Sequence, residues 1–181
     1  MIRHTEERLA GTRACARAHT HTNTPRPAFA GALLADADGN VLLEHTNAVE
    51  ATRDATEHAE LGLVRRASSH LPPETVARSY MYCSGEPCGM CACAIFWVGI
   101  PRLTYGSPGS YLGELAAQPG FKDREHPLAA GAPPVAAESV LVGANALGIE
   151  RVVEGGVLLQ EAKAVHAGYW LPPDAGAPQH G

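Results

Sequence analysis

The chain has 181 residues, 45% of them hydrophobic and 18% charged, which is typical of one globular domain and excludes disorder throughout. The net charge is -5 and the basic residues are scattered, so nucleic acid is not the expected partner. No apolar run approaches the roughly 18 residues of a membrane span, and the charged first residues do not resemble a signal peptide. We therefore expect a soluble, cytoplasmic protein without membrane contact. Its five cysteines, an odd number, suit a reducing compartment.

The first half of the chain predicts a helix, a hairpin and a second helix. Apolar and small residues recur at helical spacing over residues 2–20. Two apolar runs, 28–35 and 41–45, flank the acidic connection DADGN and predict a β-hairpin. A polar loop over residues 46–56 leads to residues 57–70, which predict a helix with a broad buried face. Asp54 or Thr56 is its expected N-cap.

The next segments alternate between strand and helix patterns. Residues 77–83 predict a third strand and residues 102–106 a fourth, and between them residues 88–99 predict a helix buried on most sides. This alternation indicates a layered α/β fold. Residues 107–137 are rich in proline and glycine, and they predict an inserted surface loop with a short helix near residues 111–117, long enough to act as a lid.

The last part of the chain returns to regular patterns. Residues 138–142 fit either a helix or a strand, residues 151–153 predict the last strand, and residues 157–167 predict a final helix. The tail is again rich in proline and glycine. We therefore expect a single domain over residues 1–171, with the 107–137 insertion as a lid, and a disordered tail over residues 172–181.

The most specific pattern in the chain is His58-x-Glu60 followed by Pro87-Cys88-x-x-Cys91. One imidazole and two thiolates are preferred ligands of Zn²⁺, and three protein ligands leave the fourth tetrahedral position for water, as catalytic sites require. Glu60 is too close to His58 in sequence to be an obvious fourth ligand and suits proton transfer instead. A Cys-x-x-Cys pair alone is weak support for a metal, but the combined pattern predicts one Zn²⁺ per chain.

Together with the segments FAGALLADADGNVL, EPCGMCACAIFW, RLTYG and GGVLLQEA, these motifs resemble the cytidine deaminase-like superfamily, and within it the branch of nucleobase and tRNA adenosine deaminases. The resemblance covers about residues 28–170. It implies a three-layer α/β/α sandwich with a five-stranded mixed sheet, in which the two metal motifs begin neighbouring helices. It also implies hydrolytic release of ammonia, with Glu60 carrying protons and the backbone at Ala59 and Cys88 orienting water and substrate.

The resemblance implies substrate contacts that also have simpler explanations. Asn47 stands where the family has an asparagine that hydrogen-bonds the base, or it is a turn residue. Phe29 either stacks on the base or belongs to the core, because the order PAFAGA departs from the family's PFGA. Asp123, in GFKD, resembles an acidic GFDD segment of guanine deaminases, or it is a solvated loop acid.

Further residues are singled out with alternatives left open. Cys83, at the end of the third strand, could line the pocket. Tyr169 and Trp170 resemble a terminal segment that closes over a pocket, either its own or that of a neighbouring chain. Phe96 and Trp97 match an aromatic pair that contributes to a dimer interface in the family, and core packing explains them as well. The resemblance therefore favours a homodimer.

The expected substrate is a small uncharged heterocycle that carries an amino group. His58 argues against a cytidine-type enzyme, which has a cysteine in place of the histidine ligand. The final segment VLLQEAKAVHAGYW has one lysine and no arginine, which argues against a tRNA enzyme. A guanine-like purine, isoguanine, cytosine or an amino-s-triazine remains. A tRNA-specific adenosine deaminase and a noncatalytic zinc-stabilised binding module, which would have four protein ligands, stay as alternatives.

Overall fold

The computed structural model describes residues 30–118, 135–143, 145 and 150–170, and for Tyr169 and Trp170 it describes the backbone alone. The expected helix over residues 2–20, the interior of the expected lid and the expected tail over residues 172–181 lie outside these ranges. Within the described residues, none of the helices is both long enough and apolar enough to cross a bilayer.

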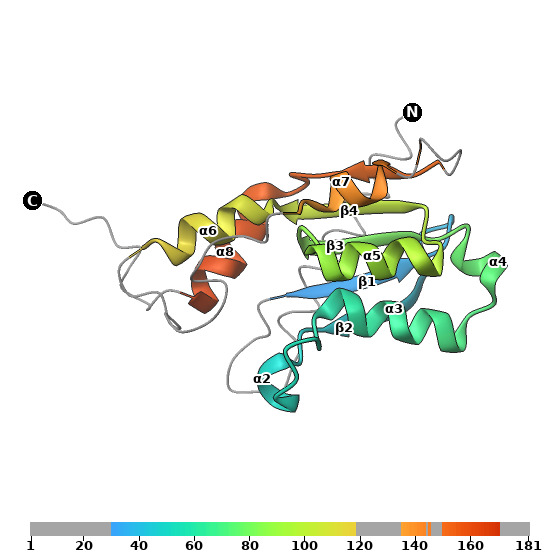
Figure 1. The fold of residues 1–181 in the computed structure, drawn as a ribbon, viewed down its shortest axis with the longest axis horizontal. Helices are drawn as coiled ribbons and strands as arrows, with labels where there is room; N and C mark the ends of the chain where they lie inside the picture. The colour runs from blue at the N-terminus through green and yellow to red at the C-terminus, as the bar shows by residue number, and fades with distance from the viewer. Residues whose placement is uncertain (1–29, 119–134, 144, 146–149, 171–181) are drawn as a thin grey trace, which may run out of the picture.

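Five strands form one mixed sheet in the order β2-β1-β3-β4-β5 (Figure 1). Strand β1 pairs antiparallel with both β2 and β3, whereas β3, β4 and β5 run parallel. This confirms the five-stranded mixed sheet expected from the resemblance. The strands are β1 (Gly31–Ala35), β2 (Val41–Thr46), β3 (Tyr80–Gly85), β4 (Arg102–Ser107) and β5 (Val152–Glu154).

The hairpin between β1 and β2 is stabilised by hydrogen bonds within its own turn. The carboxylate of Asp36 accepts hydrogen bonds from the backbone N–H groups of Asp38 and Asn40, at 3.0 and 2.8 Å. Gly39 has a φ of 86°, a conformation that glycine adopts without steric cost. The acidic, glycine-containing connection therefore gives the hairpin that the sequence predicts.

The longer helices pack on the two faces of the sheet. Helices α3 and α5 lie side by side on one face, with their N-terminal ends together (Figure 1). On the other face α8 packs closely on β4. A Cβ atom on Gly106 would lie only 2.5 Å from the Cβ atom of Ala162, so this close approach depends on glycine at position 106. The helices are α2 (Val49–Thr52), α3 (Ala59–His70), α4 (Pro73–Val76), α5 (Gly89–Val98), α6 (Gly109–Ala116), α7 (Ala137–Leu141) and α8 (Leu159–Trp170).

The main core lies between the sheet and the α3–α5 pair. Leu34, Leu63, Met81, Ile95 and Leu103 are each at most 2% exposed and belong to one apolar cluster. Burying each such side chain contributes about 1.5–3 kcal/mol relative to exposing it. The core therefore holds α3 and α5 rigidly on the sheet, which fixes the positions of their first residues.

The structure corrects three local expectations. The N-cap of α3 is His58, and neither Asp54 nor Thr56 caps it. Asp54 instead accepts hydrogen bonds from the backbone N–H and the hydroxyl of Thr56, so its side chain organises the preceding turn. The polar loop over residues 46–56 contains the short helix α2. Strand β3 begins at Tyr80 rather than at residue 77, because residues 77–79 form a hydrogen-bonded turn at the end of α4.

The segment 138–142, which fitted either a helix or a strand, is helical as α7. Its apolar residues Ala137 and Leu141 lie one turn apart and are both buried against α5. The tertiary contact with α5 therefore resolves a pattern that was ambiguous in sequence.

Candidate metal centre and active site

The two metal motifs meet because each begins a helix. His58 is the N-cap residue of α3 and Cys88 is that of α5, and Cys91 lies in the first turn of α5. Neither N-cap side chain makes a capping hydrogen bond to its own helix. The parallel placement of α3 and α5 brings these ends together at the carboxyl end of β3 (Figure 1). The side chains are therefore directed toward one another.

The three ligand atoms form a nearly equilateral triangle. His58 Nδ1 lies 3.7 Å from Cys88 Sγ and 3.7 Å from Cys91 Sγ, and the two sulfurs are 3.6 Å apart. Tetrahedral zinc with normal bond lengths separates two sulfurs by about 3.8 Å, and a sulfur and a nitrogen by about 3.6 Å. The donor set and its spacing therefore fit Zn²⁺. In the described part of the chain, the group of His, Cys, Asp and Glu atoms that gathers here has these three members.

The electrostatics of the thiols also favour a cation. The hydrogen bond from Cys91, aided by His58, lowers the pKa of Cys88 to about 4 despite its burial. The same hydrogen bond and burial raise the pKa of Cys91. The thiolate form is therefore favoured at Cys88, and a bound divalent cation would favour ionisation of both sulfurs. The positive ends of the α5 and α3 dipoles favour the same thiolate form.

Glu60 lies beside the ligand triangle rather than in it. It belongs to the first turn of α3, is 6% exposed, and has Oε2 3.9 Å from Cys91 Sγ. Burial raises the pKa of its carboxyl to about 7. A carboxyl group with a pKa near neutrality can both accept and return a proton, which is the property of a general acid and base.

Salt-linked side chains hold the loop that delivers His58. Arg65 on α3 pairs with Glu57 and donates a hydrogen bond to the hydroxyl of Thr56. The backbone N–H of Ala48 donates to the carbonyl of Glu57 at 2.9 Å, which ties the start of α2 to the same loop. The residue before the histidine ligand is therefore fixed from both sides.

Asn47 lies in this region with its side chain partly committed. Its side-chain Oδ1 accepts a hydrogen bond from the backbone N–H of Val49 at 3.2 Å. The backbone N–H of Asn47 donates to the backbone carbonyl of Ala30. The turn role weighed for Asn47 is thus present. The hydrogen bond from Val49 fixes the orientation of the Asn47 side-chain amide, so that its Nδ2 donor group points away from Val49.

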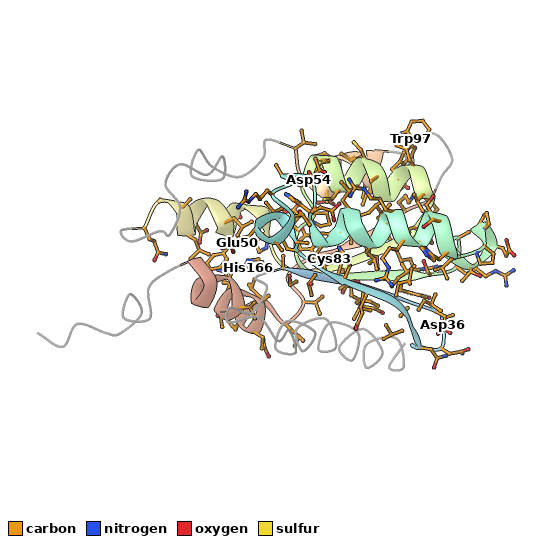
Figure 2. The ribbon with its side chains drawn as sticks, turned by 90° about the horizontal axis from the view of Figure 1, so that it is seen from below. Asp36, Glu50, Asp54, Cys83, Trp97 and His166 are labelled. Carbon is orange, nitrogen blue, oxygen red and sulfur yellow. The ribbon has the colours of Figure 1, made fainter. Side chains whose placement is uncertain are left out.

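The other substrate contacts expected from sequence are placed as follows. Ala59 is fully buried at the start of α3, and Cys83 is fully buried in the main core (Figure 2). Phe29 and Asp123 lie outside the described residues, as do the side chains of Tyr169 and Trp170.

Two side chains at the carboxyl end of β3 were not among the site residues expected from the sequence. Glu86 makes hydrogen bonds to two helices, and His166 of α8 is 1% exposed with its imidazole packed against Gly85. Both contacts join segments that are distant in sequence. A histidine in an alanine-rich helix carries no local signal of such a contact.

A His-Cys-Cys triangle at two helix N-termini, with a buried carboxylate beside it, fits a zinc site of the kind that activates water. The family model of the cytidine and deoxycytidylate deaminase zinc-binding region matches residues 5–107. The chain belongs to this family and is a deaminase.

The relatives of this chain are named as deaminases of different substrates. A probable cytosine deaminase of Schizosaccharomyces pombe is 33% identical over 77% of this chain and 78% of its own length. A tRNA-specific adenosine deaminase of Agrobacterium fabrum is 39% identical over 39% of this chain, and the guanine deaminase of Bacillus subtilis is 34% identical over 48%. The aligned regions span 46% and 53% of those two proteins, about half of their length.

Solved structures agree with the fold. The guanine deaminase of Nitrosomonas europaea is 20% identical, with a TM-score of 0.62 over 90% of this chain and 82% of that chain. A mutant of the guanine deaminase NE0047, solved in complex with 8-azaguanine, is 25% identical, with a TM-score of 0.62 over 90% of this chain and 82% of that chain. These likenesses confirm the cytidine deaminase-like α/β architecture.

Proposed function

We propose that this protein catalyses the zinc-dependent hydrolytic deamination of a free aminated nucleobase or a related heterocycle. The observation that carries the proposal is the burial of the Glu60 carboxylate next to the His58, Cys88 and Cys91 ligand atoms. A structural zinc site has no use for a buried acid that is outside the ligand set, whereas a hydrolytic site needs one.

The residues divide the work in a simple way. His58, Cys88 and Cys91 would hold the zinc, which when bound supplies a Lewis acid that activates water toward an amino-bearing ring carbon. Glu60 accepts the proton that the attacking water loses. It passes this proton to a ring nitrogen of the substrate. It then takes the remaining proton of the added hydroxyl and delivers it to the amine, as the carbon–oxygen double bond forms and the carbon–nitrogen bond breaks. The overall reaction consumes one water and releases one ammonia, so Glu60 ends in its initial state.

Two observations favour a free base as the substrate. A relative aligned over most of this chain is named a probable cytosine deaminase, and a guanine deaminase is another relative. In the described part of the final helix α8, Lys163 is the one basic side chain other than histidine, which gives little attraction for a phosphate backbone. The fixed amide of Asn47 adds a hydrogen-bond donor, which suits a ring carbonyl or ring nitrogen.

The direct test is ammonia release from a panel of aminated heterocycles by zinc-loaded protein. Guanine, isoguanine, cytosine and the triazine ammeline form the panel, with metal-depleted protein as the blank. Turnover of at least one base, lost on metal removal and restored by zinc, is the expected result. Absence of turnover across the panel from protein with one zinc per chain contradicts the proposal.

A tRNA adenosine deaminase is the second candidate, because the Agrobacterium fabrum relative is 39% identical over 39% of this chain. An anticodon stem-loop at moderate salt is the discriminating substrate. Conversion of its adenosine to inosine, without turnover of free bases, would establish this alternative. A noncatalytic binding module would show neither activity while retaining zinc.

Asn47 provides a test of base recognition by the proposed enzyme. Asn47→Asp keeps the oxygen that accepts from Val49 but removes the amide donor, whereas Asn47→Ala removes both. If the amide donates to the substrate, both variants raise KM by about 10-fold or more, since a lost hydrogen bond costs about 1–2 kcal/mol. If Asn47 serves the turn alone, steady-state kinetics will show wild-type KM for Asn47→Asp and a lower melting temperature for Asn47→Ala.

We further propose that the protein is a homodimer that pairs through the outer face of α5. This helix is apolar on all sides, which is typical of a helix covered on all sides. Its outer face presents Met90, Cys93 and Trp97, and Trp97 is 82% exposed. Figure 2 shows Trp97 projecting from α5 away from the sheet. A second copy of the same face would cover it, as two-fold symmetric interfaces do.

Replacing Trp97 with glutamate tests this interface. Trp97→Glu is expected to convert a dimer into a monomer, because it places a charge at the centre of an apolar contact. Light scattering coupled to size exclusion measures the mass. Val41→Glu is the matched control, since Val41 is also exposed, at 51%, but lies on β2. A monomeric wild-type protein, or equal dissociation of both variants, rejects the α5 interface.

A further inference from the structure

The carboxylate of Glu86 joins three separate parts of the chain. Its Oε2 accepts a hydrogen bond from the backbone N–H of Gly109 at 2.8 Å, and its Oε1 accepts one from that of Ala137 at 3.0 Å. Glu86 follows the last residue of β3 and stands two residues before the ligand Cys88. One half-buried side chain thus links the metal loop, which is the segment 86–88 between β3 and α5, to the beginnings of α6 and α7.

These two hydrogen bonds fill positions that the helices cannot fill for themselves. The first N–H groups of a helix have no partner within the helix and are normally capped by a side chain. The N-cap residues of α6 and α7 are Pro108 and Ala136, and neither makes a side-chain cap. A carboxylate is the favoured partner at this position, because its charge also complements the helix dipole.

The packing around the metal loop is consistent with this link. A Cβ atom on Gly109 would lie 3.4 Å from Glu86 Oε2, an ordinary van der Waals contact, so the carboxylate rests directly against the start of α6. The backbone N–H of Glu86 also donates to the carbonyl of Ser107 at 2.8 Å. Beyond Cys88, a Cβ atom on Gly89 would meet Val135 at 3.4 Å. Both ends of the segment between β4 and α7 therefore lie against the loop that carries Cys88.

We propose that Glu86 is a positioning residue that holds Cys88 in its zinc-binding place by anchoring the metal loop to α6 and α7 together. The carboxylate does not belong to the ligand set, and it acts through the backbone that carries the sulfur. Partners of this kind, which orient metal ligands, typically alter metal affinity by about 10- to 100-fold when they are removed. The inference depends on the metal centre of the proposed function but not on the identity of the substrate.

The experiment measures zinc release from the full-length, zinc-loaded protein into an excess of a chromogenic chelator, with no substrate present. Glu86→Gln keeps the size of the side chain but replaces one accepting oxygen with an amide donor. It is expected to release zinc about 10-fold faster than wild type. Glu114→Gln is the matched control, since it removes the same charge from an exposed position on α6 and should release zinc at the wild-type rate.

A second readout follows the thiolate ligands themselves. In cobalt-substituted protein, Glu86→Gln is expected to weaken or shift the sulfur-to-cobalt charge-transfer band, which a change in helix stability alone would leave in place. Wild-type zinc release from Glu86→Gln, or equal acceleration by Glu86→Gln and Glu114→Gln, overturns the proposal. If Glu86→Gln does not fold, Glu86→Asp replaces it, because the shorter carboxylate cannot span both helices; wild-type zinc release from that variant also overturns the proposal.

These outcomes are separate from those of the substrate panel. A protein that binds one zinc but deaminates none of the tested bases refutes the proposed function and leaves the zinc-release comparison fully measurable. Conversely, an active deaminase whose Glu86→Gln variant retains zinc like the wild type refutes the role of Glu86 alone.

Discussion

Glu60→Gln is expected to lower turnover by about 1,000-fold while zinc stays bound at one per chain. The amide has the same shape as the carboxyl group but can neither take a proton from water nor return one to the amine. Because Glu60 is outside the ligand triangle, its neutral replacement leaves the His58, Cys88 and Cys91 contacts intact. Ammonia release under saturating substrate, together with metal analysis of the same sample, measures both effects.

The control for Glu60→Gln is Glu74→Gln, an exposed acid on α4 with no contact to the metal motifs. It should show wild-type turnover and wild-type zinc content. Substantial activity of Glu60→Gln in a fully zinc-loaded sample would contradict the role of Glu60 as the proton carrier. Loss of zinc from that variant would instead place the carboxylate among the ligands.

Cys91→Ser is expected to reduce zinc affinity by more than about 100-fold and to abolish turnover with it, because a hydroxyl is a poor replacement for a thiolate ligand. Cys91 is fully buried and its sulfur contributes two sides of the ligand triangle. Competition with a chelator of known affinity gives the change in zinc binding. A fall in melting temperature of the purified variant toward that of metal-depleted wild type should accompany it.

Cys93 offers a close comparison for the Cys91 variant. It lies on the same helix but on the exposed surface, and its sulfur is not part of the ligand group. Cys93→Ser is therefore expected to keep zinc affinity and turnover unchanged. Equal zinc loss from both variants would mean that the metal is not held where the triangle places it.

The elements with strong local patterns were predicted well from the sequence. The hairpin around DADGN, the helices after His58 and Cys88, and the last strand and helix lie within a few residues of their predicted ranges. These segments are specified by periodic apolar residues and by turn residues that act over a few positions. The predicted helix and strand boundaries were less accurate, as the N-cap of α3 shows. His58 has no strong intrinsic preference for an N-cap position. It occupies that position because the loop before it is held by Asp54, Glu57 and Arg65.

The candidate site divides in the same way. Residue types and short spacings predict the metal ligands and Glu60, so the zinc chemistry could be inferred without a structure, and the resemblance of the motifs indicated the deaminase class. The arrangement of distant segments is visible only in the folded chain: the ligand triangle between two helices, the orientation of the Asn47 amide, the exposed face of α5, and the double contact of Glu86. Such features depend on packing between segments that are far apart in the chain, and no local pattern of residues encodes a distance between two helices.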